Sequence, residues 1–268
     1  MYIFSNHERY IGQLENGEKC GYGVYHYANC NIYYGFWAHD KKNGKGIYIY
    51  QLTNEKYEGN WLNGMKSGYG IFELCNGDVF KGNWKEGKKC GEGVIVYNNG
   101  SIFEGTWEND KANGQGRISY ANDDKYEGSF QNVKKHGYGV YRFASGTVYQ
   151  GYWSNDVKEG KGIMHYSNGD KYEGFWQNDM KNGEGLYIYT NNGAKYIGYW
   201  QNDQRHGQGQ LIDDNSGKMY QGDFLQGKKS GFGVLMYENG DCYEGQFMND
   251  LREGPGIYKW QNGDTFEG

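Results

Sequence analysis

Aromatic and small residues alternate with polar residues along most of this chain. Tyr57, Gly59 and Trp61 are separated by single polar residues, and a second segment of this kind begins at Gly68 and Gly70. Residues two apart lie on the same face of a β-strand, so this pattern predicts strands with one face of rings and glycines. No stretch carries the 3.6-residue period of an amphipathic helix, and we expect no helix of two turns or more.

The pattern is repetitive. An aromatic-x-Gly triplet recurs every 23 or 24 residues, and Gly-x-Gly always follows eleven residues after the opening aromatic. We expect one array over residues 1–268, with a half repeat at 1–9, repeats that start at residues 10, 33, 57, 80, 103, 126, 149, 172, 196, 220 and 243, and a partial repeat at 266–268. The extra residues of the 24-residue repeats fall after Gly-x-Gly, in the connection to the next repeat.

Each repeat is expected to form a β-hairpin. A ring lies flat on a sheet only where its neighbour lacks a Cβ, so the glycines should make room for the rings. About five polar residues, such as 62–66, should join the two strands, and an Asn-Gly-Asp turn such as 76–78 should lead into the next repeat. Two repeats show the structural signature at Tyr57, Gly59, Trp61, Gly68, Gly70, Tyr172, Gly174, Trp176, Gly183 and Gly185.

Residues 172–185 read Tyr-Glu-Gly-Phe-Trp-Gln-Asn-Asp-Met-Lys-Asn-Gly-Glu-Gly, which resembles the MORN repeat, and this resemblance covers essentially the whole chain. The resemblance implies an all-β fold: a single-layer antiparallel β-hairpin solenoid of about eleven repeats, elongated and twisted, that mediates protein–protein contact. An all-MORN chain is similar to radial spoke head components and to cytoskeletal scaffolds of protists. The partners implied are therefore proteins of a cytoskeletal or axonemal complex, and the location implied is cytoplasmic, with the axoneme of a cilium or flagellum as the leading hypothesis.

Composition removes several classes of function. The net charge of −5 does not favour a nucleic-acid partner. The five cysteines form no CxxC pair and are typical of free thiols in a reducing compartment. The six histidines lack metal-site spacing, no phosphate-binding glycine motif occurs, and no catalytic triad can be assigned. We therefore expect no catalytic residue, no cofactor, no metal and no enzyme activity.

A basic residue stands nine positions after most opening aromatics. The row comprises Lys42, Lys66, Lys89, Lys135, Lys158, Lys181, Arg205, Lys229 and Arg252. One interpretation is a cationic ridge that makes weak, salt-sensitive contact with anionic lipid or acidic protein tails. The other is a turn position that prefers a long solvated side chain, with an acid two or three residues earlier that cancels its charge, as Asp40 would for Lys42.

Two features point to partners. In nine of eleven repeats an aliphatic residue such as Ile71 or Ile163 falls on the face opposite the rings, and apolar area on both faces of one sheet suggests contact with other molecules. The chain also starts and stops in mid-repeat, so we expect at least one end strand to be covered by a second copy, by a partner strand or by more of a longer natural chain. The leading hypothesis is a protein-binding scaffold; the alternative is a peripheral membrane adaptor that reads anionic lipid through the basic row.

Overall fold

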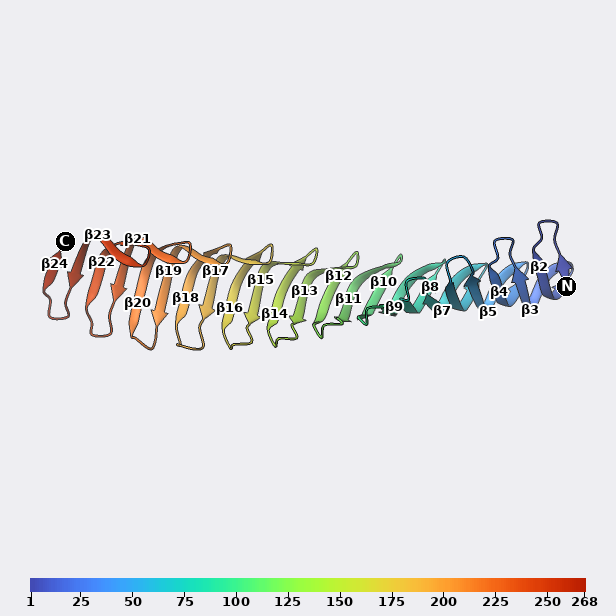
Figure 1. The fold of residues 1–268 in the computed structure, drawn as a ribbon, viewed down its shortest axis with the longest axis horizontal. Helices are drawn as coiled ribbons and strands as arrows, with labels where there is room; N and C mark the ends of the chain where they lie inside the picture. Colours follow the sequence, from blue (N-terminus) through green and yellow to red (C-terminus); the bar gives the residue numbers. More distant parts are fainter. The chain divides into compact units, whose positions relative to one another are not determined.

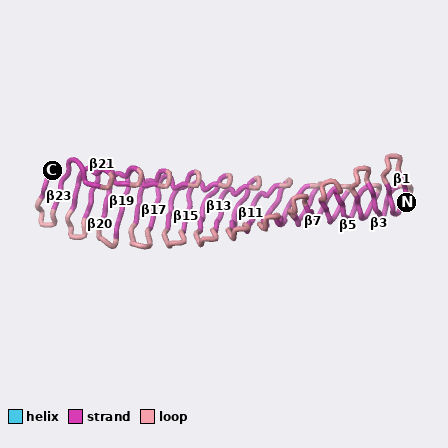
Figure 2. The backbone as a smooth tube through the Cα atoms, in the orientation of Figure 1, coloured by secondary structure: helices cyan, strands magenta, loops and turns pink.

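The computed structural model describes residues 1–268, which form β-strands joined by short turns and contain no helix (Figure 1; Figure 2). The strands fall into two compact units, Met1–Lys134 and Lys135–Gly268. Within each unit, every strand pairs antiparallel with the strands that precede and follow it in the sequence. The expectation of an all-β fold built from antiparallel hairpins is therefore confirmed.

The strands of the first unit are β1 (Tyr2–Ile3), β2 (Arg9–Glu15), β3 (Glu18–His26), β4 (Ile32–Ala38), β5 (Lys41–Tyr50), β6 (Glu55–Leu62), β7 (Met65–Glu73), β8 (Val79–Lys85), β9 (Lys88–Val96), β10 (Ile102–Glu108), β11 (Lys111–Ser119) and β12 (Lys125–Gln131). Those of the second unit are β13 (Lys134–Arg142), β14 (Val148–Ser154), β15 (Val157–His165), β16 (Lys171–Gln177), β17 (Met180–Ile188), β18 (Lys195–Gln201), β19 (Gln204–Asp213), β20 (Lys218–Leu225), β21 (Lys228–Met236), β22 (Cys242–Met248), β23 (Leu251–Lys259) and β24 (Thr265–Glu267).

The turn inside each hairpin is shorter than the sequence suggested. Strand β6 ends at Leu62 and β7 begins at Met65, so only Asn63 and Gly64 form the turn, where about five residues were expected. Both turn residues have positive φ, 50° and 86°, which is the two-residue turn whose twist matches that of paired strands. The flanking residues looked like loop because they are polar, but they are paired strand residues, since Leu62 faces Met65 in the ladder.

The connection between repeats is the longer one. Residues 74–78 join β7 to β8, and Gly77 there has a φ of 89°, as the Asn-Gly-Asp motif predicts. The extra residue of one 24-residue repeat lies in such a connection, at 189–194 between β17 and β18. In the other two the expectation was wrong, because the strands on either side gain a pair, Tyr50 with Glu55 and Asp213 with Lys218, and the connection shortens to four residues. The turn also ties neighbouring repeats together: Asp170 accepts hydrogen bonds from the backbone N–H of Thr190 at 2.8 Å and from the Tyr187 hydroxyl at 2.9 Å.

The opening aromatic of each repeat is buried against two glycines. Tyr57 is 0 % exposed, and a Cβ built on Gly59 would lie 2.5 Å from its hydroxyl oxygen and 2.6 Å from the Cα of Gly70. A Cβ on Gly70 would lie 2.6 Å from the same ring. Gly59 and Gly70 face each other in the ladder, so the ring spans two strands of its own hairpin. The expectation that the glycines make room for the rings is confirmed.

A β-bulge follows the first glycine of most repeats. The register between β6 and β7 shifts between Gly59 and Trp61, which leaves Asn60 without a partner on that side. The Tyr57 hydroxyl donates a hydrogen bond of 3.0 Å to the Asn60 carbonyl. All nine opening tyrosines make the equivalent bond, at 2.9–3.1 Å. The ring therefore satisfies the backbone group that the bulge frees.

The ring four residues further on joins one repeat to the next. Trp61 lies edge-on to Tyr57 of its own repeat, with ring centroids 5.2 Å apart, and to Tyr33 of the preceding repeat at 5.5 Å. Its indole N–H donates to the Gly46 carbonyl of the preceding repeat at 3.2 Å. Edge-to-face aromatic pairs contribute beyond the area they bury. The core of each unit is thus a continuous row of rings on one face of the sheet.

Replacement of Gly70 by alanine should be strongly destabilising. The new methyl group would overlap the Tyr57 ring, which is fully buried and has no space to move into, and overpacking of this kind costs about 2 kcal/mol. Hydrogen exchange should show the loss of protection concentrated in β6 and β7, because repeat arrays couple to their nearest neighbours. The control is Glu58→Ala, an exposed position on the opposite face, and equal effects of the two changes would contradict the packing argument.

Candidate binding surfaces

The two faces of each sheet differ in what they display. The aromatic face carries the opening aromatics, the rings four residues later and the basic residues, as Tyr57, Trp61 and Lys66 show. The open face carries the alternating residues in between, such as Glu58 and Ile71. The aliphatic residues that the sequence placed opposite the rings do lie on the open face. No helix or second sheet is available to cover it.

The basic residues of the aromatic face lie among the rings. The Lys42 Nζ is 4.2 Å from the ring centroid of Trp61 and 4.5 Å from that of Tyr48, with Tyr33 at 5.7 Å and Tyr27 at 6.0 Å. These four rings come from three successive repeats, so the ammonium joins them. Most of the row is half-buried, and Arg252 alone of its nine members is exposed. Cations bind ring faces in this arrangement. We call a lysine of this row, together with the rings around its ammonium group, a lysine cage.

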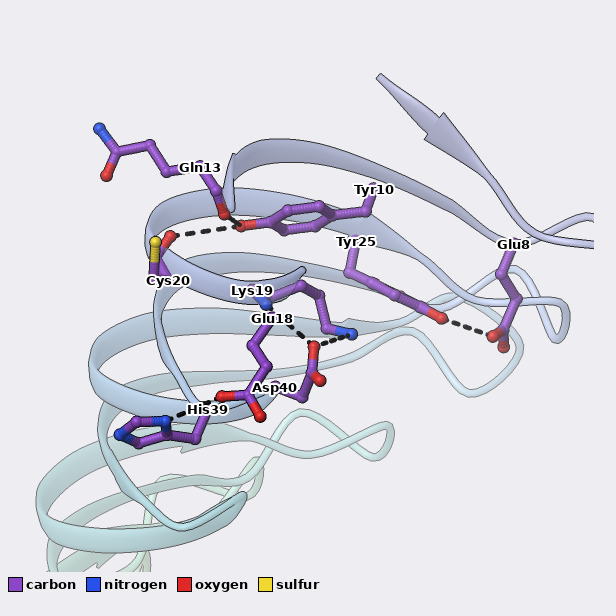
Figure 3. Close-up of polar contacts among 9 residues, drawn as sticks. All are labelled: Glu8, Tyr10, Gln13, Glu18, Lys19, Cys20, Tyr25, His39 and Asp40. Atoms are coloured by element: carbon purple, nitrogen blue, oxygen red, sulfur yellow. Dashed lines mark hydrogen bonds and ion pairs between the residues drawn. The ribbon is translucent and has the colours of Figure 1, made fainter. Parts of the chain in front are cut away.

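Where an acid faces a lysine of this row, it comes from the next repeat. Figure 3 shows this in the first hairpin, where the Lys19 Nζ lies 2.8 Å from Asp40, whose carboxylate also accepts the Lys19 backbone N–H at 2.9 Å. The same backbone bond joins Lys181 to Asp203. The interpretation that Asp40 cancels the charge of Lys42 was therefore wrong, because Asp40 pairs with Lys19 of the preceding repeat. The positive φ of the second turn residue turns its carboxylate back toward the preceding repeat.

Two lysine cages have no acid of this kind. Glycine replaces aspartate in the turns that follow Lys42 and Lys66, at Gly64 and Gly87. Burial lowers the pKa of both lysines to about 8. The pKa of Lys181 is also lowered by burial, but the Asp203 carboxylate opposes that effect. Lys42 and Lys181 therefore occupy cages of the same four ring types and differ in the acid.

This difference predicts that replacement by methionine changes the stability of the chain differently at Lys42 and at Lys181. Lys42→Met keeps the apolar stem and removes a desolvated charge, so the variant should be at least as stable as wild type at pH 7. Lys181→Met leaves Asp203 without its ammonium partner, 3.7 Å away, and should cost about 1 kcal/mol. Thermal unfolding of both variants at pH 7 measures the contrast, and equal losses in the two variants would refute it.

The lowered pKa of Lys42 predicts that the stability difference between the wild type and Lys42→Met depends on pH. The folded chain releases the Lys42 proton near pH 8, whereas the unfolded chain holds it up to about pH 10.4. The unfolded state thus binds more protons between these values, so wild-type stability rises relative to Lys42→Met as the pH increases from 8 to 10. Paired thermal scans at pH 7, 8, 9 and 10 should show the difference between the two proteins change in that direction. A difference that is flat across this window would contradict the lowered pKa.

The open face displays exposed rings. Eight large aromatic side chains on it are between 39 % and 55 % exposed: Tyr22, Phe36, Tyr69, Tyr138, Tyr152, Phe175, Tyr199 and Phe232. Two neighbouring pairs pack edge to face with centroids 5.6 Å apart, Tyr22 with Phe36 and Tyr138 with Tyr152. Exposed rings at this density are typical of interaction surfaces. The aliphatic positions of this face were predicted from the sequence but its rings were not, although their alternation with the glycines would have revealed them.

Each unit has a groove on its open face at equivalent positions. The groove of the first unit has a volume of about 420 Å³ and contains Tyr22, Phe36 and Lys45. The groove of the second has a volume of about 390 Å³ and contains Tyr138, Tyr152 and Lys161, each 116 residues further along the chain. Glycine backbone forms the floor of both grooves. The open face therefore has the same construction in both units and differs in the side chains it presents.

The structure contains no group of metal ligands, no disulfide and no membrane-spanning helix. No three His, Cys, Asp or Glu side chains are grouped as metal ligands. All five cysteines are free thiols, as expected. No helix with the length and hydropathy of a membrane span occurs. The features that distinguish this chain are the lysine cages and the open face.

Comparison with known proteins identifies the repeat. The sequence model of the family described as MORN repeat matches eleven segments, at residues 10–29, 33–51, 57–79, 80–102, 103–125, 126–148, 149–171, 172–194, 196–218, 220–242 and 243–265. No curated protein matches the sequence.

Several solved structures are similar in part. The wild-type TCP10 domain of Danio rerio CPAP in complex with a peptide of Danio rerio STIL is 11 % identical over 84 % of this chain and 94 % of that chain, with a TM-score of 0.43. The same domain without the peptide gives 10 % identity, 83 % and 92 % coverage and a TM-score of 0.32. The TCP10c domain of Drosophila melanogaster Sas-4 is 16 % identical over 66 % of this chain and 91 % of that chain, with a TM-score of 0.29. None of these scores reaches 0.5, so the function is argued from the residues of this chain.

Proposed function

Because this chain belongs to the MORN repeat family, we propose that it is a non-enzymatic scaffold that binds other proteins through its open face, as a structural component of a cytoskeletal or ciliary assembly. The exposed rings of the open face carry this proposal. They lie between apolar aliphatic residues and above glycine backbone, and no element covers them. The choice of assembly and of a cytoplasmic location rests on the resemblance of the repeat pattern to all-MORN spoke head components and protist cytoskeletal scaffolds.

The alternative function is binding of anionic lipid through the basic row. The ammonium groups that would contact lipid phosphates lie in cages of rings, and several already have a carboxylate partner. To contact phosphates they would have to leave these rings. The geometry therefore favours the open face as the binding surface.

Detergent extraction of cells tests the proposal. The wild-type chain should remain in the detergent-insoluble cytoskeletal fraction, and the triple variant Tyr152→Ser, Phe175→Ser and Tyr199→Ser should move to the soluble fraction. These rings are half-exposed, so their replacement should leave the fold intact, which a far-UV spectrum checks. The control is Lys81→Gln, an exposed open-face change outside both grooves that keeps every ring. Retention that survives loss of the three rings would overturn the proposal.

Liposome co-sedimentation addresses the alternative directly. Vesicles that contain phosphatidylserine should bind the chain weakly in low salt and lose it at about 0.5 M salt, where the Debye length is only a few ångströms. Binding that persists at that salt concentration, and that falls when Lys135 and Lys158 are replaced by glutamine, would favour the membrane adaptor.

A further inference from the structure

Three rings of the second unit stand at the same position in three consecutive repeats. Tyr152, Phe175 and Tyr199 each lie three residues after an opening tyrosine, on β14, β16 and β18. Each is the residue of a β-bulge, and its carbonyl accepts the hydrogen bond of the opening tyrosine. We call these three residues the aromatic ladder.

The spacing of the ladder selects one kind of ligand. Neighbouring strands are about 4.8 Å apart, so rings on alternate strands are about 9.6 Å apart. A polyproline II helix advances about 3.1 Å per residue with three residues per turn, which is about 9.3 Å per turn. Two turns of an α-helix advance about 10.8 Å, and two residues of a strand about 6.8 Å, so neither stays in register over three repeats. Only the polyproline helix presents an equivalent residue at every ring.

The charges between the rings refine the ligand. Lys161 lies on β15 between Tyr152 and Phe175, and its Nζ is 5.4 Å from the Phe175 ring centroid. Glu184 lies on β17 between Phe175 and Tyr199 and accepts a hydrogen bond from the Tyr199 hydroxyl at 3.0 Å. Both side chains are exposed. One positive and one negative group thus lie at equivalent positions of successive repeats along the ladder.

The remaining acid beside the ladder is neutralised. The Glu173 carboxylate lies 2.8 Å from the Lys171 ammonium on the same strand. The charges left to match in a ligand are therefore those of Lys161 and Glu184. A ligand complementary to them carries an acidic and a basic residue one polyproline turn apart, that is, three residues apart.

We propose that the aromatic ladder binds a proline-rich segment of a partner protein in the polyproline II conformation, with an acidic residue opposite Lys161 and a basic residue opposite Glu184. Proline rings fit between aromatic side chains, and the preformed helix loses little entropy on binding. This proposal rests on the open face as the binding surface and adds the class of partner. The first unit offers no such ladder, because the repeats after Phe36 have Asn60 and Asn83 at the equivalent position.

Fluorescence anisotropy with the full chain tests the proposal. The probe is a labelled twelve-residue peptide of proline with one glutamate and one lysine three positions apart. Phe175→Ala should weaken its binding at least about tenfold, because a central aromatic anchor dominates such contacts. The matched control is Phe36→Ala, which removes a half-exposed bulge ring outside the ladder and should leave affinity unchanged. Equal losses from the two changes, or no binding by wild type, would overturn the proposal.

Altered peptides and charges test its two components. A peptide with glycine and serine in place of proline should bind at least about tenfold more weakly, and a helical peptide with the same charges should not compete. Lys161→Glu and Glu184→Lys should each weaken binding about fivefold, and the double exchange should restore it, because a polyproline helix keeps its three-residue period when its direction is reversed. Equal binding of the flexible peptide would refute the conformation, and a double exchange that restores nothing would refute the charge match.

The extraction assay separates this proposal from the wider one. If the peptide fails to bind but the triple ring variant still leaves the cytoskeletal fraction, the open face binds proteins and the polyproline assignment is wrong. If both fail, the open face itself is not the binding surface.

Discussion

The structure depends on one tyrosine ring that lies over two facing glycines. The ring needs both glycines, because a Cβ on either would overlap it, and the glycines need the ring, because a strand without side chains packs poorly. The hydroxyl adds a second constraint, since it bonds the carbonyl that the bulge frees. Phe80 and Phe103 keep the ring without the hydroxyl, so filling the space over the glycines is the common requirement and the hydrogen bond is an addition.

The bulge connects the packing of the aromatic face with the position of a side chain on the open face. A bulge places one extra residue in a strand and re-aims its side chain. Here that side chain projects from the open face, while its carbonyl is held by the ring on the aromatic face, as for Phe175 and Tyr172. In the nine repeats that open on tyrosine, the contact that stabilises the hairpin therefore also fixes the position of one displayed side chain. A single layer of sheet thereby acquires a rigid row of positions on the face that it does not need for its own core.

Much of this architecture follows from the sequence. The period, the strand pairs and the packing of Tyr57 over Gly59 are predictable, because each depends on local alternation or on a residue that lacks a Cβ. The hairpin turn was predicted too long, since Leu62 and Met65 are exposed like loop residues yet pair across the turn. The lysine cages were not foreseen, because Lys42 contacts rings from three repeats and only the stacking of hairpins brings them together.

Variation among the repeats separates what folds from what binds. The opening position is tyrosine or phenylalanine in all eleven repeats, and the position three residues later carries Gln13, Phe36, Asn60, Asn83, Thr106, Ser129, Tyr152, Phe175, Tyr199, Asp223 and Gln246. In nine repeats the carbonyl at this position accepts the hydroxyl of the opening tyrosine whichever side chain the residue carries, so this contact does not select the side chain. This position holds amides, hydroxyls, an acid and rings, and it holds rings in three consecutive repeats only at the aromatic ladder, which is where we propose that the partner binds. The contacts that stabilise the hairpins therefore do not explain why rings occupy this position in the aromatic ladder.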